Sequence, residues 1–243
     1  MKFLSLGIIQ GITEFLPISS SGHLYILKRL LGLQGDYFSF FIFLHIATLA
    51  AIVIFLSKNL KWLFDKRLLT RIAVITVITA IMGLSIKFYL GSLFGNKNLL
   101  TFCFIINAGI LLSIRPGSGN KTYKDMTYKD AFIIGIMQGF SPFPGISRSG
   151  VTIAGFLRRG FSRKQAFVLS FLLAIPVMIG AFILEFKELI TNSFVFKDMA
   201  IGFISAFLSG LIALGVVKKT LLNQRFKNFA YYCLILAILN WAL

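Results

Sequence analysis

Six long apolar runs constrain the fold of this chain more than any other feature of its sequence. A run of roughly 18 or more apolar residues is typical of a transmembrane helix. Only 14% of the residues are charged and 57% are hydrophobic, which excludes a soluble globular protein. We therefore expect an all-α polytopic membrane protein, with spans at about 38–56, 72–90, 99–114, 165–185, 198–217 and 228–243.

The net charge of +17 is concentrated in some of the segments between these runs. Segments 57–71, 115–130 and 218–227 are rich in Lys and Arg, whereas 91–98 and 186–197 carry fewer basic residues. Cytoplasmic loops of membrane proteins hold the excess of basic residues, so the first three segments are expected inside and the other two outside. Because the basic residues flank spans and form no separate domain, we expect contact with anionic membrane lipid and no nucleic-acid binding.

Two further segments are too short to cross a bilayer and are broken near their middle by proline. One has arms at 3–16 and 20–31, and the other has arms at 131–141 and 147–158. With the spans alternating as above, each segment has to enter and leave the membrane on the same face. We expect two re-entrant helical hairpins, the first from the outer face and the second from the inner face. Irregular backbone at membrane depth is tolerated where it is buried in protein or lines a wet cavity.

The two hairpins contain an internal repeat. QGITEFLPISSSG at 10–22 aligns without gaps with QGFSPFPGISRSG at 138–150, and the identical positions are Gln, Gly, Phe, Ile, Ser, Ser and Gly. Three spans follow each hairpin, and an odd number turns the second copy upside down. We expect one membrane domain, 1–243, built as an inverted-topology repeat of about 1–114 and about 130–243. Such architectures place their site near the membrane midplane, between the halves.

The hairpin tips carry the features of an anion site. Ser19 or Ser20 is placed to cap the second arm of the first hairpin, and Ser147 to cap that of the second. Helix N-termini attract anions, phosphate above all. Arg148 adds a planar fork of donors that suits phosphate oxygens. Two such tips converging from opposite faces predict a pocket for a doubly phosphorylated group.

Other polar side chains surround these tips. Gln10 and Glu14 are four residues apart on one helical arm, so they face the same way, and a carboxylate beside a phosphate site is suited to hold Mg²⁺ or Ca²⁺. The remaining candidates for contact with the substrate are Ser19, Ser20, Ser21, His23, Ser147, Ser149 and Thr152.

Structural roles compete with these interpretations. Glu14 and Arg148 also suit a buried ion pair that joins the two halves, although intramembrane ionisable residues are functional by default. His23 also suits a hydrogen-bonded structural role, and the serines of the first tip also suit helix caps alone. For His45 and Asn107, lone polar residues within spans, we favour interhelical hydrogen bonds.

Four stretches together resemble one known family. QGITEFLPISSSGH at 10–23 and PGISRSGVT at 144–152 are similar to the two signature motifs of the undecaprenyl-pyrophosphate phosphatases, also called bacitracin-resistance proteins. FLLAIPVMIGA at 171–181 and DMTYKDAF at 125–132 resemble further segments of that family. The resemblance implies six spans and two hairpins in inverted repeats, and a cation-dependent enzyme of the bacterial inner membrane whose site opens outward. It further implies removal of the terminal phosphate from the C55 isoprenyl pyrophosphate, whose monophosphate serves again in cell-wall peptidoglycan synthesis.

The resemblance also assigns residues by their place in its motifs. The acidic motif falls on Gln10 and Glu14, and the Gln at its first position leaves one fewer carboxylate for the cation. The hydroxyl and imidazole of the first motif and the phosphate-binding side chains of the second fall on Ser20, His23, Ser147, Arg148 and Thr152. We expect His23 to be the nucleophile or general acid/base, with Ser20 as its competitor and attack by water left open.

The sequence thus predicts a phosphatase for an isoprenyl pyrophosphate lipid. The alternative is a flippase or transporter of the same lipid carrier, because secondary carriers share inverted repeats and broken midplane segments. Glu14 and His23 favour the enzyme, since transport alone needs neither a nucleophile nor a proton acceptor. An ion channel is disfavoured because the polar cluster is confined to the tips. Association of two copies as a homodimer stays open at this point.

Overall fold

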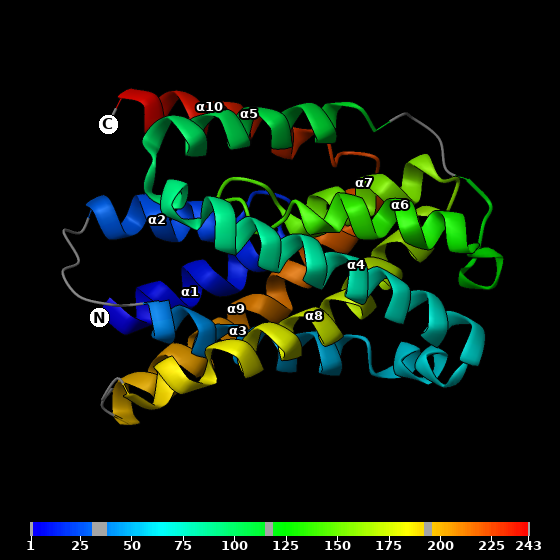
Figure 1. Cartoon of the computed structure of the whole chain (residues 1–243), viewed down its shortest axis with the longest axis horizontal. Coiled ribbons are helices and arrows are strands. Elements are labelled where there is room, and N and C mark those ends of the chain that lie inside the picture. Colours follow the sequence, from blue (N-terminus) through cyan, green and yellow to red (C-terminus); the bar gives the residue numbers. More distant parts are fainter. Residues whose placement is uncertain (1, 31–37, 115–118, 192–195, 243) are drawn as a thin grey trace.

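The chain folds into a bundle of helices that run roughly along its longest axis (Figure 1). The computed structural model describes residues 2–30, 38–114, 119–191 and 196–242. Over these residues the chain is helical, apart from turns and one isolated backbone pairing between Lys121 and Phe161. The elements are α1 (Lys2–Phe15), α2 (Ser20–Leu30), α3 (Phe38–Phe55), η1 (Ser57–Phe64), α4 (Lys66–Leu90), η2 (Gly91–Gly95), α5 (Lys97–Leu112), η3 (Tyr123–Asp125), α6 (Tyr128–Gly139), α7 (Arg148–Arg158), α8 (Arg163–Thr191), α9 (Phe196–Leu222) and α10 (Asn228–Ala242).

All six predicted spans are apolar helices over the described residues, which confirms the all-α class and is compatible with a membrane protein. Among the described residues, the segments Lys66–Gly95, Arg163–Leu184 and Phe196–Leu222 are long and apolar enough to cross a membrane by length and composition. The helix at Phe40–Phe55 reaches that standard only together with η1, into which the chain bends by 87°. The other two, α5 and α10, are apolar but shorter, with 16 and 15 residues. How many of the six cross the bilayer therefore stays a prediction.

Both predicted breaks are present where the sequence places them. The first falls between α1 and α2, and the second between α6 and α7. Ser19 caps α2 by accepting a hydrogen bond from the Gly22 N–H (3.3 Å), and Ser147 caps α7 by accepting one from the Gly150 N–H (3.2 Å). In Figure 1, α1 and α2 lie in the left half of the bundle and α6 and α7 in the right half. The two pairs of short helices thus approach one another from opposite ends.

Each hairpin packs mainly against a long helix from the other half of the chain. The most extensive contacts of α1 are with α9, and those of α6 are with α4. The 128-residue offset between Gln10 and Gln138 also relates α1 to α6 and α4 to α9. The same packing therefore occurs twice with the partners exchanged, and it fixes the first arm of each hairpin across the two halves.

Glycine allows α1 to lie directly on α9. A Cβ atom added at Gly11 would lie 2.1 Å from Ser209 Oγ and 2.3 Å from the Ala206 carbonyl oxygen. Small residues at helix contacts in membranes let backbones approach this closely. Because Gly11 follows Gln10, this contact also sets the position of the first hairpin's polar residues.

Replacing this glycine is therefore expected to destabilise the fold. Overpacking by Gly11→Ala should lower the free energy of unfolding by about 1–3 kcal/mol. The matched control is Gly215→Ala in α9, where an added Cβ has open space around it. Thermal unfolding in detergent should show a lower Tm for the first variant and an unchanged or higher Tm for the second. Equal Tm values would contradict the close α1–α9 contact.

A buried carboxylate fixes the base of the second hairpin. Asp130 in α6 is fully buried. It accepts hydrogen bonds from Arg159 Nε at the end of α7 (2.6 Å) and from Lys121 Nζ (3.4 Å). Its Oδ2 also accepts from the Thr127 backbone N–H (3.0 Å), and Thr127 Oγ1 accepts from the Asp130 N–H (3.1 Å), which forms a capping box. The two arms of the hairpin are thereby joined at their outer ends, so the tip can take one defined position.

Candidate active site

Direct hydrogen bonds join the tips of the two hairpins. Ser19 Oγ accepts a bond from the Gly145 N–H (3.0 Å). Asn107 of α5 donates from Nδ2 to the Pro17 carbonyl (2.9 Å) and accepts at Oδ1 from the Ser147 N–H (3.0 Å). We expected Asn107 to make interhelical hydrogen bonds. In the structure its amide also bonds to the backbone at both hairpin breaks. The two capped N-termini are held together in the middle of the molecule.

The backbone at these tips adopts conformations that few residues tolerate. Ser19 has φ +67° and Gly145 has φ +100°. A Cβ at position 145 would also come within 2.7 Å of Cys103 Cβ. Left-handed backbone at a non-glycine residue costs of the order of 1 kcal/mol and persists where surrounding structure enforces it, often at functional sites. The tips are therefore held in one shape before any ligand binds.

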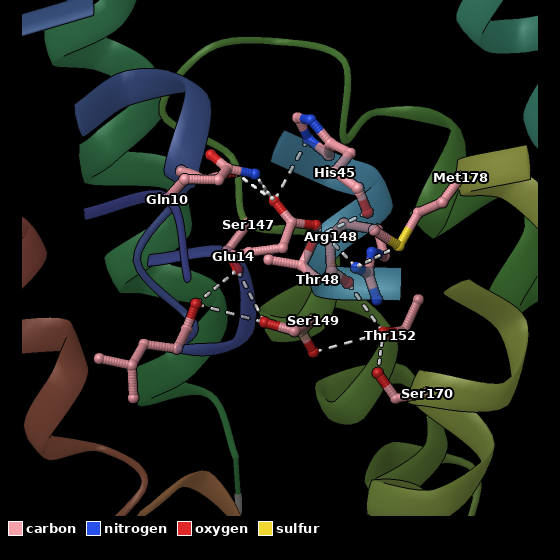
Figure 2. A network of polar contacts seen from close by, with 12 residues as sticks. Gln10, Glu14, His45, Thr48, Ser147, Arg148, Ser149, Thr152, Ser170 and Met178 are labelled. Carbon is pink, nitrogen blue, oxygen red and sulfur yellow. Dashed lines mark hydrogen bonds and ion pairs between the residues drawn. The ribbon is translucent and has the colours of Figure 1, made fainter. Parts of the chain in front are cut away.

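An ion pair between the two hairpins forms the centre of the site (Figure 2). Arg148 Nη2 lies 2.9 Å from Glu14 Oε1, and both side chains are largely buried. Glu14 Oε2 accepts hydrogen bonds from Ser20 Oγ (2.6 Å) and from Gln10 Nε2 (3.2 Å). The Glu14–Arg148 ion pair, which the sequence suggested as a structural alternative, is present. Together with the Ser20 hydrogen bond it holds the carboxylate, the hydroxyl and the guanidinium next to one another.

Two polar atoms beside this ion pair have no hydrogen-bond partner. Gln10 Oε1 and Arg148 Nη1 are buried and unpaired among the described residues. Such atoms are rare in native proteins, and each needs an explanation. Arg148 is also held by α8, since its Cζ lies 5.9 Å from the Phe171 ring centre and its Nη2 lies 3.8 Å from Met178 Sδ. One acceptor and one donor are thus fixed in the site, and no group among the described residues satisfies them.

The polar residues around Arg148 mainly hold its helical turn. Ser147 Oγ and Ser149 Oγ bond to each other (3.1 Å) and are buried. Thr152 Oγ1 donates to the Arg148 carbonyl (2.8 Å) or to Ser170 Oγ (2.6 Å), and it is also buried. These three predicted substrate ligands lie in the site region, but their hydroxyls bond to neighbouring protein groups.

The first hairpin places Ser21 and His23 differently from Ser20. Ser21 is exposed, and its Oγ lies 3.2 Å from Ser19 Oγ. His23 Nδ1 lies 2.7 Å from the Ser19 carbonyl oxygen, and its Nε2 lies 2.8 Å from the Tyr232 hydroxyl of α10. A carbonyl only accepts, so Nδ1 carries a hydrogen, and in the neutral ring Tyr232 donates to Nε2. Both ring nitrogens are therefore engaged away from Glu14.

The imidazole that does contact Glu14 belongs to His45 of α3. Its Nε2 lies 3.4 Å from Glu14 Oε2. In Figure 2 the imidazole and the Gln10 amide both lie above the Glu14 carboxylate. An interhelical contact was the expectation for His45, and this is confirmed, but the partner is the acid of the site. The only signal in the sequence was a lone histidine within a span. We call Gln10, Glu14, Ser20, His45 and Arg148 the Glu14 cluster.

Comparison with known proteins identifies close relatives over nearly the full chain. The family described as bacitracin resistance protein BacA matches residues 3–239. A protein of Thermosipho africanus (strain TCF52B) named undecaprenyl-diphosphatase is 41% identical over 98% of both chains. Proteins with the same name from Thermosipho melanesiensis and Methanococcus vannielii are 40% and 38% identical over 98% of this chain and cover 97% and 98% of their own length.

Proposed function

Because the chain belongs to the BacA family of bacitracin resistance proteins, we propose that it is an undecaprenyl-diphosphatase that acts at the Glu14 cluster. The reaction is the hydrolysis of undecaprenyl diphosphate to undecaprenyl phosphate and orthophosphate. The observation that carries the assignment to this site is the guanidinium of Arg148. Its Nη2 pairs with Glu14, whereas its Nη1 is buried and has no partner among the described residues.

The diphosphate is expected to bind where the two hairpins meet. Arg148 Nη1 is a donor that a phosphate oxygen can satisfy, and Nη2 already fixes the plane of the guanidinium against Glu14. The N-termini of α2 and α7 add positive ends of helix dipoles at the same place. The isoprenyl tail finds a hydrophobic environment in the lipid and on the apolar helices around the site. Positioning and neutralisation of the phosphates is the main catalytic work in phosphoryl transfer.

We assign the nucleophile to Ser20. Its hydroxyl donates to Glu14 Oε2 at 2.6 Å, which is the geometry of a nucleophile with its base. In this proposal Glu14 takes the proton as Ser20 Oγ attacks the terminal phosphorus and the anhydride bond breaks, releasing undecaprenyl phosphate. Water then attacks the phosphoserine, Ser20 Oγ leaves and regains its proton from Glu14, and orthophosphate is released. His23 is better placed to anchor the first tip to Tyr232 than to attack phosphorus.

The residues present also fit a divalent cation, Mg²⁺ or Ca²⁺. Gln10 Oε1 is a buried oxygen with no partner in the described part of the chain, and it lies on the same arm as the Glu14 carboxylate. No group of three or more His, Cys, Asp or Glu residues suited to a metal occurs in the described residues. Mg²⁺ is often held by one or two protein oxygens together with substrate phosphates and water. When bound, the cation would neutralise charge on the diphosphate, and Gln10 and Glu14 would hold it.

The arrangement in the membrane is part of the same proposal. We infer six spans with two re-entrant hairpins in the bacterial inner membrane, a site open to the outer face and a role in cell-wall peptidoglycan synthesis and bacitracin resistance. The basic segment around η1 and the segment around η3 lie at the right end in Figure 1, away from α2 at the left. The positive-inside rule makes that right end cytoplasmic. A homodimer remains a prediction from the sequence.

Phosphate release in detergent tests the function. The purified protein with undecaprenyl diphosphate and Mg²⁺ should liberate orthophosphate in the absence of any bilayer, whereas a pure carrier should not. Addition of EDTA should abolish the release, and excess Mg²⁺ or Ca²⁺ should restore it, because the cation offsets charge that Arg148 alone cannot. A folded, monodisperse protein that releases no orthophosphate would refute the function. Full activity in EDTA would refute the cation site alone.

A further inference from the structure

His45 is the member of the Glu14 cluster that the proposed reaction does not yet use. It comes from α3, whereas the other members come from the two hairpins. Its side chain is 35% exposed, against 8% for Glu14 and 11% for Arg148. The imidazole therefore lies at the more open edge of the cluster and contacts its acid from there.

The hydrogen bonds of His45 define which atoms carry hydrogen. Nδ1 lies 2.7 Å from the Phe41 carbonyl oxygen one turn earlier in α3, and a carbonyl only accepts, so Nδ1 is a donor. Nε2 faces Glu14 Oε2 at 3.4 Å, and a carboxylate oxygen also only accepts. The contact is attractive only with a hydrogen on Nε2 as well, so the ring carries both hydrogens as an imidazolium.

We propose that His45 is a positioning residue of the phosphatase reaction, whose Nε2–H donates to Glu14 Oε2 and keeps that oxygen directed at Ser20. The inference rests on the proposed function, because it concerns the acid and hydroxyl assigned above. It makes α3 a third element of the site, in addition to the two hairpin tips. It also separates the two histidines of the chain, with His45 supporting the acid and His23 supporting the fold of the tip.

The need for such a donor follows from the double use of Arg148. In the structure its Nη2 pairs with Glu14 Oε1, and in the complex the same guanidinium also meets the diphosphate. When Arg148 also binds a phosphate group, its ion pair with Glu14 is weakened. The donor on His45 contacts the other oxygen, Oε2, which is the one that accepts the Ser20 hydroxyl. It therefore acts on the step in which Glu14 takes the proton, and not on substrate binding.

Paired substitutions separate this role from a structural one. The side-chain amide nitrogen of Gln replaces imidazole Nε2 at a similar distance from the backbone, whereas that of Asn replaces Nδ1. We expect His45→Gln to retain kcat within about 10-fold, and His45→Asn and His45→Ala to lose about 100-fold, because displacement of a catalytic group by about 1 Å has that effect. KM for undecaprenyl diphosphate should stay within about two-fold in all three variants, because a lost interaction made only in the transition state lowers kcat.

The control is Ile54→Ala, which removes an exposed side chain from the same helix and should leave kcat and KM unchanged. Tm in detergent is measured for every variant, and the Gln and Asn variants decide the question if the Ala variant does not fold. Equal kcat for Gln and Asn, wild-type kcat for Ala, or a change confined to KM would overturn the role of His45 while the wild type still releases orthophosphate. Absence of release by the folded wild type would instead overturn the proposed function, and the role with it.

Discussion

Arg148→Ala is expected to lower kcat/KM for orthophosphate release by on the order of 10³-fold or more, the effect of removing an arginine that neutralises a transferring phosphoryl group. The substitution removes both the unpaired buried donor Nη1 and the Nη2 partner of Glu14. Both kcat and KM should worsen, since the guanidinium contacts the diphosphate before and during the reaction. The measurement is release of orthophosphate from undecaprenyl diphosphate in detergent, with Mg²⁺ in excess.

Loss of Arg148 also leaves Glu14 as a buried charge without its main partner, which costs about 3–5 kcal/mol. The Tm of each variant must therefore be measured beside its activity. Arg148→Lys keeps the charge but lacks the planar fork, so it should fold better than the Ala variant and still lose most activity. Arg158→Ala, an exposed arginine at the other end of α7, is the matched control and should behave as the wild type. Wild-type activity in a folded Arg148→Ala protein would remove the basis of the proposed site.

Much of the fold could be predicted because its signals are local or periodic. Proline and serine mark the breaks. Ser19 caps α2 and Ser147 caps α7, as the sequence suggests. The repeat of Gln10 in Gln138 pointed to two equivalent hairpins, and both first arms do pack on equivalent long helices. The Gln10 and Glu14 pair lies on one face of α1 because residues four apart on a helix always do.

The site was predicted less completely because it depends on packing between distant elements. The sequence places His23 in the first motif and His45 alone within a span, yet the first bonds to Tyr232 and the second contacts Glu14. The choice depends on how α3 and α10 pack beside the hairpin, which a single sequence does not contain. Asn107 is a similar case: its amide bonds to two breaks that are separated by more than a hundred residues. The sequence shows where the motifs lie in the chain. It does not show which side chains from other helices contact them.

Glu14→Gln is expected to reduce kcat by about 10²–10⁴-fold, the usual contribution of a positioned proton acceptor. The amide has nearly the shape of the carboxylate, so the contacts with Ser20 and Arg148 lose charge but little geometry. The Ser20 hydroxyl then has no base. In contrast with the Arg148 variants, KM should stay the same or fall, because Glu14 no longer competes with the diphosphate for the guanidinium. A lower kcat with an unchanged or lower KM is what we expect when a carboxylate acts as the base for the nucleophile.

Steady-state kinetics at several Mg²⁺ concentrations would separate this role from cation binding. If Glu14 acts mainly as the base, high Mg²⁺ should not rescue the Gln variant, whereas a weakened cation site should be rescued at least in part. Asp125→Asn in η3 removes one acidic residue from an exposed position away from the site and serves as the control, with wild-type kcat expected. A Glu14→Gln protein with a higher KM and unchanged kcat would mean that the carboxylate serves to bind the substrate, and Ser20 would then need another proton acceptor. The short Glu14–Ser20 contact argues for the first outcome, because a hydroxyl that already donates to a carboxylate is aligned to lose that same hydrogen.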